Sequence, residues 1–493
     1  MTLTPLFRRF VLAALACVAV GRLSAAQPVS SSAAGGDGVV PPRLLVLTDI
    51  EADPDDTQSL VRLFLYLNEI ELEGLVATTS TWKQNSIAPE SLHALIDAYA
   101  RVHDHLVLHD RRYPTPDGLR ALVKSGRPEY GLRGVGAGKD TEGSDWIIRC
   151  LETDDARPLW ISVWGGANTL AQALHTLQAT KSPAELDRLV AKLRVYTISD
   201  QDDSGPWIRK TFPNLFYIVT PGGNYGRATW TGIHTVVDGI DNTTISNRWL
   251  AENIQQGRGP LGAMYPDVSW SMEGDTPAFL GLIPNGLNAP EHPDWGGWGG
   301  RYELYLPEAG APDPDALVNG VTLPPETRPI WTNAIDTYTP PVRAAYGRPV
   351  QPGKKTFQDA KVTLWRWRDD IQNDFAARIR WTTQPFAAAN HPPVPAIDQP
   401  DRLTVKSGST TSLSARGTTD PDGDSLSFHW FFYPEAGTYR GELKVNQPDN
   451  ADLVSFTAPK VEKPETLHLI LRVTDKGTPA LTRYKRVLVT VTP

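Results

Sequence analysis

Continuous apolar runs that alternate with helical patterns are the feature of this chain that most constrains its fold. Six runs are typical of strands covered on both faces: RLLVLTD (43–49), LEGLVATTS (72–80), HLVLHD (105–110), PLWISVWGG (158–166), LRVYTISD (193–200) and LFYIVTP (215–221). The segments 56–71, 86–103 and 168–180 carry apolar residues at three- and four-residue spacing, which indicates helices. This alternation predicts an α/β domain with a mostly parallel, doubly wound sheet and helices on both faces.

The composition and the hydrophobic pattern of the chain change twice after this region. From about residue 285 the sequence is irregular and rich in Trp, Gly and Pro, and 362–381 is expected to form one helix that ends the domain. Short alternating strands then predict a small β-sandwich of immunoglobulin-like type at 397–493, after a proline-containing linker at 386–396. The α/β domain is therefore expected to span 41–385.

The N-terminus is typical of an export signal. Arg8 and Arg9 precede a short apolar run, and small residues lie just before position 27, so residues 1–26 are expected to be a signal peptide. Residues 27–40 are expected to be a flexible leader. The apolar run is too short for a membrane span, and no later stretch reaches the roughly 18 residues that one needs. We expect an exported protein, periplasmic or extracellular.

The net charge bears on which partners the protein can bind, and the cysteine count on whether it can form a disulfide bond. The formal charge is −8, and removal of residues 1–26 takes away three arginines and no acid, which leaves −11. This acidity disfavours nucleic acid and anionic membranes as partners. The signal would also remove Cys17, so Cys150 has no disulfide partner and is expected in the core.

Five carboxylates lie within eight residues directly after the first predicted strand: Asp49, Glu51, Asp53, Asp55 and Asp56. One interpretation is a solvated loop that caps a helix, because Asp53 and Asp55 suit a helix start. The other is a site for a hard cation such as Ca²⁺, which takes six to eight oxygen ligands and would offset the repulsion. The position at the carboxyl end of a buried strand, where such sheets bind ligands, favours the cation.

Other polar clusters follow predicted strands and are expected at the same edge. Trp82 and Asn85 follow the second strand, and could line a sugar pocket. Asp200, Asp202 and Asp203 follow a later strand and are expected to accept sugar hydroxyls, since carboxylates make strong charge-assisted hydrogen bonds. The alternative for the three acids is an acidic turn ahead of a helix.

The segment HPDWGGWGGRYE places two tryptophans, Trp295 and Trp298, among glycines, with Arg301 close behind. One interpretation is a lid that stacks on sugar rings, in which Arg301 grips an acid or a hydroxyl. The other is a structural aromatic loop, in which glycine lets the chain turn tightly.

Two further clusters are interpreted as structural. Asp420, Asp422 and Asp424 could hold a structural calcium ion, but a tight turn built from Asp, Pro and Gly is the favoured interpretation. The three histidines of 103–109 lack a paired zinc spacing and are expected around a surface strand.

The segment DIEADPDD (49–56) resembles the D-x-D-x-x-x-D-D motif of the nucleoside hydrolases, with Glu51 as its second acid. LEGLVATTS, WGGANTLAQAL and EGDTPAFL resemble later segments of that superfamily in the same order, over roughly residues 40–290. Through SDQDDSGPWIR, FPNLFYIV, WGGWGGRYEL and the C-terminal sandwich, the whole chain is similar to a bacterial exported family of cellulose-binding proteins with a nucleoside-hydrolase-like domain.

The resemblance implies a Ca²⁺ site with a role for each matched residue. It implies Asp56, Asp275 and the Ala167 carbonyl as ligands, Glu51 as ligand and general base, Asp55 as acceptor of a sugar hydroxyl, and Asp49 as support. Where purine-specific nucleoside hydrolases carry a histidine as the leaving-group acid, this chain has Gly274, so the preceding Glu273 is the expected acid.

These expectations lead to a calcium-dependent glycoside hydrolase that acts on a sugar derived from plant polysaccharide or on a related glycoside. The alternatives are a non-catalytic protein that binds cellulose or another carbohydrate, and a ribonucleoside hydrolase. Members of the superfamily often associate through helices, so a homo-oligomer is also an expectation.

Overall fold

The computed structural model describes residues 40–493 apart from 224, 307–316, 319–320, 323–325, 342–352 and 354. The predicted signal peptide, and the predicted leader up to residue 39, lie outside the described residues. Within the described part, no helix combines the length and the apolar character that a membrane crossing requires.

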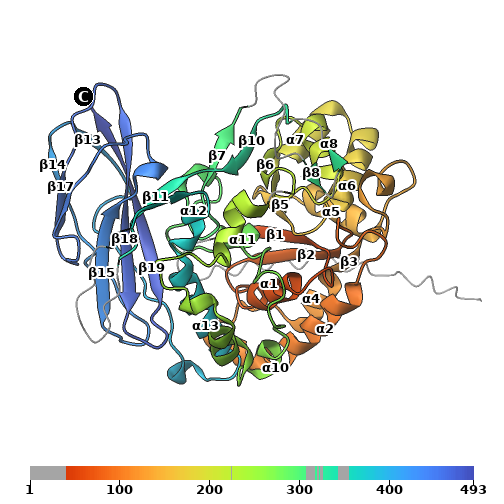
Figure 1. Cartoon of the computed structure of the whole chain (residues 1–493), viewed down its shortest axis with the longest axis horizontal. Coiled ribbons are helices and arrows are strands. Elements are labelled where there is room, and N and C mark those ends of the chain that lie inside the picture. Colours follow the sequence, from red (N-terminus) through yellow and green to blue (C-terminus); the bar gives the residue numbers. More distant parts are fainter. Residues whose placement is uncertain are drawn as a thin grey trace, which may run out of the picture. The chain divides into compact units, whose positions relative to one another are not determined.

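An eight-stranded sheet forms the centre of the larger lobe (Figure 1), with strand order β3-β2-β1-β4-β5-β6-β10-β7. Its strands are β1 (Arg43–Thr48), β2 (Glu71–Ala77), β3 (Val123–Ser125), β4 (Leu159–Val163), β5 (Leu193–Ser199), β6 (Phe216–Thr220), β7 (Tyr302–Tyr305) and β10 (Ile330–Asn333). All neighbours pair in parallel except β7, which runs antiparallel to β10. Every residue of the central strand β1 is buried. The predicted mostly parallel α/β sheet is thus confirmed.

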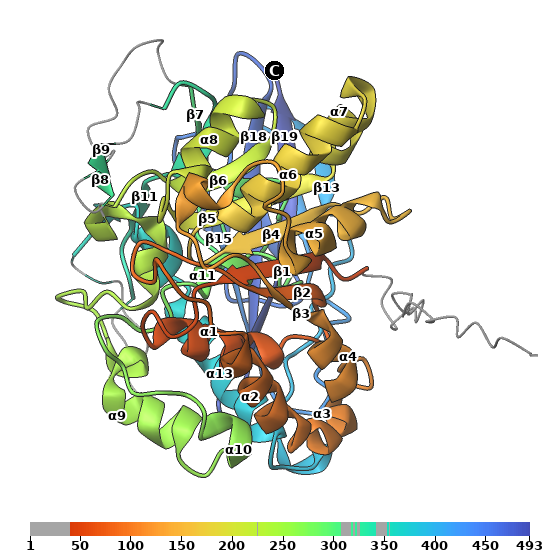
Figure 2. The ribbon, with the colours of Figure 1, turned by 90° about the vertical axis from the view of Figure 1, so that its right-hand side faces the viewer.

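Helices cover both faces of this sheet (Figures 1 and 2). One face is covered by α5 (Glu142–Glu152), α6 (Asn168–Thr180), α7 (Pro183–Ala191) and α8 (Ser204–Thr211). The other face carries α1 (Asp55–Phe64), α2 (Pro89–Ala100), α3 (His103–His109), α4 (Pro116–Leu122), α9 (Asn247–Leu250), α10 (Gly259–Gly262), α11 (Pro277–Leu280), α12 (Val362–Trp365) and α13 (Arg368–Trp381). Capping boxes begin α5 at Thr141 and α7 at Ser182, so local sequence fixes both helix starts.

Two predicted elements are corrected by the structure. The segment 105–110, expected as a strand, lies within helix α3 and the turn after it, and Leu106 is the helix's buried residue. Six residues are too few for periodicity to separate a strand from a helix. The segment 362–381 forms two helices, α12 and α13, because the chain breaks at Arg366, whose guanidinium is ion-paired to Asp336 at 3.1 Å. Cys150 is buried, as expected.

The C-terminal lobe consists of two sheets around a core of their own. One contains β13 (Arg402–Lys406), β15 (Leu426–Phe432), β18 (Glu465–Asp475) and β19 (Thr482–Thr492); the other contains β14 (Thr410–Leu413), β16 (Val445–Asn446) and β17 (Val454–Thr457). In the loop before β15, the Asp420 carboxylate accepts hydrogen bonds from the backbone N–H groups of Asp422 (2.9 Å) and Asp424 (3.0 Å). This is the geometry of the favoured tight turn.

Buried polar contacts join α13 to β19. The Asp370 carboxylate accepts hydrogen bonds from the hydroxyls of Thr482 (3.2 Å) and Tyr484. Arg483 is ion-paired to Asp374 at 2.7 Å, and both side chains are almost fully buried. The predicted linker therefore does not keep the β-sheet lobe away from the α/β lobe. Buried carboxylates of α13 have their hydrogen-bond and ion-pair partners on β19.

Candidate functional site

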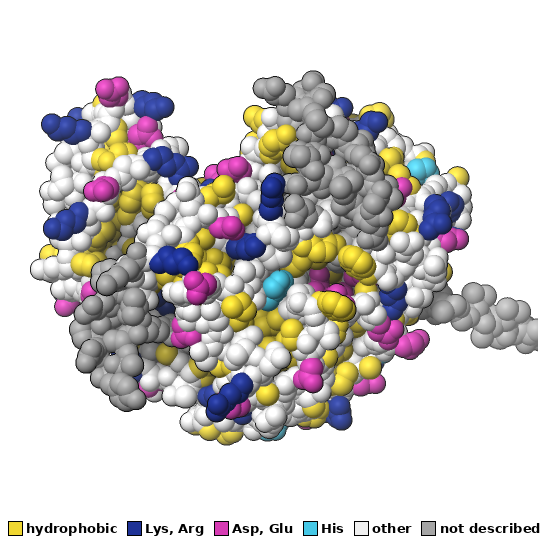
Figure 3. All heavy atoms as spheres, in the orientation of Figure 1, with side chains coloured by type: hydrophobic (Ala, Val, Ile, Leu, Met, Phe, Trp, Pro, Cys, Tyr) yellow, Lys and Arg dark blue, Asp and Glu magenta, His cyan; other side chains and the backbone are white. Residues whose placement is uncertain are grey.

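The carboxyl ends of β2, β1, β4 and β5 lie side by side, because these strands are parallel neighbours. Asp49 follows β1, Thr78 follows β2, the Gly165–Gly166 turn follows β4, and Asp200 follows β5. Over this part of the molecule, Figure 3 shows acidic side chains inside a hollow whose rim is largely hydrophobic. Four polar segments that are distant in sequence therefore meet at one edge, as predicted.

A cluster of carboxylates occupies this edge. Asp53, Asp55 and Asp56 each offer one oxygen, and these oxygens lie within 4.8 Å of one another. Asp55 and Asp56 form the first turn of α1, and the Thr48 hydroxyl at the end of β1 donates a hydrogen bond to Asp56. The Asp53 carboxylate accepts the backbone N–H of Asp55 at 3.0 Å. Strand β1 and the start of α1 thus fix the three acids in place.

Asp49 and Asp275 complete the acidic cluster. The charges of Asp55, Asp56 and Asp49 all act on Asp275, which is only 2% exposed and has one buried oxygen without a hydrogen-bond partner among the described residues. Asp49 lies against the turn after β4: a Cβ atom at Gly165 would lie 2.6 Å from Asp49 Oδ1. Glycine is therefore required where this turn approaches the acids.

Burial, followed by repulsion between the acids, governs the protonation of the cluster. Burial is the largest cause that raises the pKa of Asp55, Asp56 and Asp275 well above the usual range, and neighbouring carboxylates raise each further. Burial likewise raises the pKa of Asp49 to about 6. The neighbouring Lys83 ammonium donates its hydrogen bonds to the Ile50 carbonyl (2.8 Å) and to Glu51. The cluster is therefore short of positive charge.

The donor set suits a hard divalent cation. Such ions bind several carboxylate oxygens at once, and the partnerless buried oxygen of Asp275 is a vacant ligand atom. Asp53, Asp55, Asp56 and Asp275 are the residues that would hold the ion. The Ala167 carbonyl, an expected ligand, accepts the N–H of Ala171 at 2.9 Å in the first turn of α6.

Glu51, the expected base and ligand, points away from the cluster. Its backbone is left-handed (φ 75°), and its side chain is 57% exposed and bound to Lys83 at 3.1 Å and to the Ser91 hydroxyl. Asp53, two residues further on, places a carboxylate oxygen beside those of Asp55 and Asp56. Motif spacing pointed to Glu51, but spacing does not show which way a left-handed turn directs a side chain.

Glu273, the expected leaving-group acid, is a structural ion-pair partner. Its side chain is fully buried, and both oxygens are bound by Arg62, at 2.5 and 3.0 Å. The hydroxyls of Tyr265 (2.7 Å) and Thr276 (2.9 Å) also donate to it. With its lone pairs thus occupied, Glu273 is not placed to protonate a leaving group.

The three acids after β5 have separate roles. Asp200 is buried and paired with Arg209 at 2.8 Å, which occupies its carboxylate. Asp203 is exposed, and its Oδ1 accepts the N–H of Leu132 at 2.8 Å. Asp202 lies closest to the turn after β4: a Cβ at Gly166 would come within 2.4 Å of its Oδ2. Burial raises the pKa of Asp202 to about 7.

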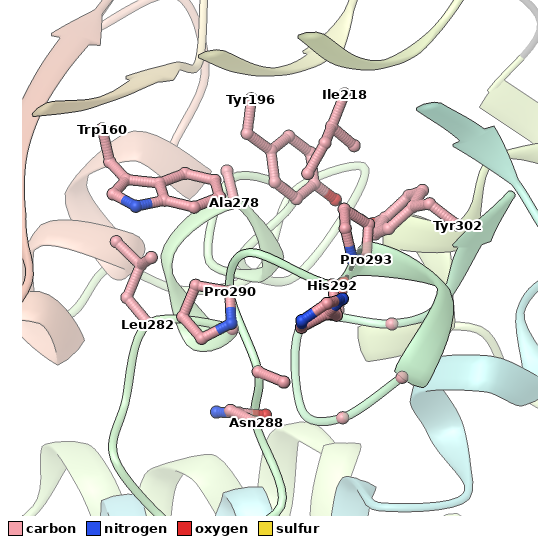
Figure 4. A pocket seen from close by; sticks show the side chains of 16 residues that line it. Trp160, Tyr196, Ile218, Ala278, Leu282, Asn288, Pro290, His292, Pro293 and Tyr302 are labelled. Carbon is pink, nitrogen blue, oxygen red and sulfur yellow. Dashed lines mark hydrogen bonds between the residues drawn. The ribbon is translucent and has the colours of Figure 1, made fainter. Parts of the chain in front are cut away.

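The Gly- and Trp-rich loop packs inside the molecule, which corrects the lid prediction. Trp298 is fully buried, Trp295 stacks on His292 with ring centroids 4.0 Å apart, and Arg301 is ion-paired to Asp336 at 2.6 Å. The loop lines a cavity against β4 and β5; Figure 4 shows Trp160 on one side of it and His292 on the other. This is the structural aromatic loop that was the alternative.

Aromatic residues form part of the surroundings of the acids. Trp82 is exposed, as is Asn85, and both follow β2 as expected. Tyr225 packs against Trp230 with centroids 5.4 Å apart, and both the Trp82 side chain and the charge of Asp49 act on its hydroxyl. Sequence analysis missed Tyr225, because nothing in its local sequence ties it to the first strand.

A segment before Asp275 was also missed. Ser271 donates a hydrogen bond to Asp55 at 3.3 Å, and Trp270 beside it is 96% exposed. A Cβ at Gly274 would lie 2.5 Å from Asp55 Oδ2, so the segment approaches the acids closely. An isolated tryptophan between two serines carries no periodic signal, and could have been found only by its closeness to the EGDTPAFL segment.

A mostly parallel α/β sheet with clustered carboxylates after its first strand is the arrangement of a nucleoside-hydrolase-like protein. The chain belongs to the family described as "Cellulose-binding Sde182, nucleoside hydrolase-like domain", which matches residues 43–302. Residues 410–491 match "Cellulose-binding protein Sde0182, C-terminal domain". The resemblance inferred from sequence is thus confirmed.

A solved structure agrees with this assignment. A nucleoside hydrolase-related hypothetical protein from Saccharophagus degradans, described as associated with carbohydrate metabolism, is 34% identical with a TM-score of 0.76, over 92% of this chain and 100% of that one. The effector protein XOO4466 is 12% identical (TM-score 0.28; 59% of this chain and 87% of that one), a similarity too low to support an argument. No curated protein matches the chain.

Proposed function

We propose that this chain is an exported glycoside hydrolase that uses Ca²⁺ in its acidic cluster and acts on a neutral sugar derived from plant polysaccharide. The observation that carries the proposal is an oxygen of Asp275 that is buried and has no hydrogen-bond partner among the described residues, within a cluster of acids whose pKa values burial and mutual repulsion raise. The cellulose-binding description of the family supports a carbohydrate ligand. The predicted export signal would place the protein in the periplasm or outside the cell.

The residues of the cluster have distinct roles in this proposal. Asp53, Asp55, Asp56 and Asp275 would hold the cation, which when bound supplies a water of lowered pKa and a clamp for sugar hydroxyls. Cleavage of a glycosidic bond builds positive charge on the sugar, which the nearby carboxylates stabilise. Asp53 takes the role of proton acceptor that sequence had given to Glu51, since it faces the cluster.

A non-catalytic carbohydrate-binding protein is the second candidate. It is favoured by a specific observation: the two residues expected to act as base and acid, Glu51 and Glu273, are both bound to other side chains. A protein that only binds sugar needs the acidic hollow and its aromatic surroundings, but no proton donor for a leaving group.

Cation binding should be visible as thermal stabilisation. If Ca²⁺ binds the folded state alone, Ca²⁺ at 100 times its dissociation constant should stabilise the protein by about 2.7 kcal/mol. Asp56→Asn should lose most of this shift, whereas Asp117→Asn, an exposed acid on α4, should retain it. The measurement is a thermal melt with and without Ca²⁺ after chelation; an unchanged melting temperature at millimolar Ca²⁺ would contradict the cation site.

Hydrolysis separates the candidate functions. Release of reducing sugar from a panel of neutral glycosides should fall about 100-fold in Asp53→Asn and on chelation, because each removes electrostatic stabilisation of the transition state. Binding without any sugar release, in protein loaded with Ca²⁺, would instead establish the non-catalytic candidate. Free base released from inosine or uridine would point to a ribonucleoside hydrolase.

A further inference from the structure

Two exposed tryptophans flank the acidic cluster. All fifteen tryptophans of the chain lie in the described part, and of these only Trp82 (58%) and Trp270 (96%) are largely exposed. They come from distant segments, one after β2 and one before α11. A large indole left in water forfeits the burial that usually stabilises it by a few kcal/mol.

The backbone segment that carries each of these tryptophans is hydrogen-bonded, through a serine, to a different carboxylate of the cluster. The Trp82 backbone N–H donates to the Ser80 hydroxyl at 3.0 Å, and the Ser80 side chain is hydrogen-bonded to Asp49. On the other segment, Ser271 adjoins Trp270 and donates to Asp55 at 3.3 Å. One serine thus lies between each tryptophan and an acid, and the two indoles approach the cluster along separate segments.

The backbone at Trp270 is strained. Its φ of 66° lies in the left-handed region, which a bulky residue rarely occupies and which costs roughly 1–3 kcal/mol. The strain is not offset by burial, because the side chain is almost completely exposed. Strained residues of this kind concentrate at ligand sites, where a bound molecule covers them.

We infer that Trp82 and Trp270 are stacking platforms for two sugar rings, so that the ligand is an oligosaccharide running across the acidic hollow with a ring on each side of the carboxylates. The inference rests on the proposed function in that the hollow receives a sugar. A flat indole matches the apolar face of a pyranose ring, while carboxylates bind the hydroxyls at the ring edge.

The test measures affinity against the number of sugar rings. Neutral β-glucan oligosaccharides of one to six units are titrated calorimetrically into the full chain and into the variants Trp82→Ala, Trp270→Ala and the double variant. Wild-type affinity should rise with length until the chain reaches both indoles. Each single variant should lose about tenfold for the longer ligands, as for a central aromatic contact, and the double variant should lose the dependence on length.

Controls separate stacking from misfolding and from catalysis. Trp270→Tyr should restore most of the affinity, and Leu453→Ala, an exposed apolar residue of the C-terminal lobe, should bind like wild type. The titrations are repeated in the Asp56→Asn background. Length dependence that persists there upholds the platforms without the cation site, whereas absence of hydrolysis in wild type loaded with Ca²⁺ is the result that counts against the catalytic proposal. Tryptophan variants that bind every length like wild type, or a wild type that binds no oligosaccharide, would overturn the inference.

Discussion

Replacement of Arg62 by methionine is expected to destabilise the protein by about 3–5 kcal/mol, because it leaves the fully buried Glu273 carboxylate without its counter-charge. Arg62 also donates to the Ile371 carbonyl at 3.2 Å and lies over the Phe375 ring at 3.9 Å. The pair thus ties α1 to the segment before α11 and to α13. Urea denaturation followed by tryptophan fluorescence measures the loss.

Two companion variants give this expectation its control. In Arg62→Met/Glu273→Met neither charge remains, so most of the stability should return, as for other buried pairs replaced by apolar residues. Arg248→Met removes an exposed pair with Glu252 and should change stability by less than about 1 kcal/mol. Were Glu273→Gln to fold with unchanged stability and lose only hydrolysis, Glu273 would regain the role of leaving-group acid.

Acidification is expected to destabilise the protein through His468 on β18. This imidazole is 1% exposed, and burial together with the nearby Arg486 charge lowers its pKa to about 3. Arg486 donates a hydrogen bond to His468 Nδ1 at 2.9 Å, which only the neutral ring can accept. As the pH falls below about 6.5, His468 binds a proton in the unfolded chain but stays neutral in the folded chain. The free energy of unfolding therefore falls progressively towards pH 3.

The loss should reach about 2 kcal/mol between pH 6.5 and pH 5, at about 1.4 kcal/mol per pH unit. Urea denaturation at pH 7 and pH 5 measures it in wild type and in His468→Gln, whose stability should depend less on pH by that amount. His429→Gln is the control, since His429 is half exposed and bonded to Asp449 at 2.8 Å. Parallel pH profiles of wild type and His468→Gln would show that His468 is not the group responsible.

The sheet could be predicted because strands that are buried on both faces require continuous apolar runs in the sequence. Strand β1 needs six consecutive residues that tolerate complete burial, and this produces the apolar run before Asp49. Topology then places every loop after a parallel strand at one edge, which is why Asp55 and Asp56 could be expected beside the turn after β4. Asp275 directly follows no strand of this sheet and was expected at the site only from the family resemblance. The predicted cluster thus depended on strand order for the acids after β1 and on the resemblance for Asp275.

The inward or outward direction of individual side chains could not be predicted. Glu51 and Asp53 are two residues apart, and the left-handed backbone at Glu51 decides which one faces the cluster. Glu273 pairs with Arg62, which lies 211 residues away in sequence, and no sequence pattern near either residue indicates the pairing. Trp298 has the same neighbours in sequence whether it forms a lid or a core, and only tertiary packing decides.

The salt-linked junction between α13 and β19 has a consequence for how the chain can be divided. A domain that is joined only by a flexible linker can be deleted or exchanged without destabilising the rest of the protein. Here the loss of β19 would remove the hydroxyls of Thr482 and Tyr484 from Asp370, and would leave Asp374 with Arg378 but without Arg483. The C-terminal lobe is therefore part of the same folded unit as the α/β lobe, and removal of β19 should destabilise both.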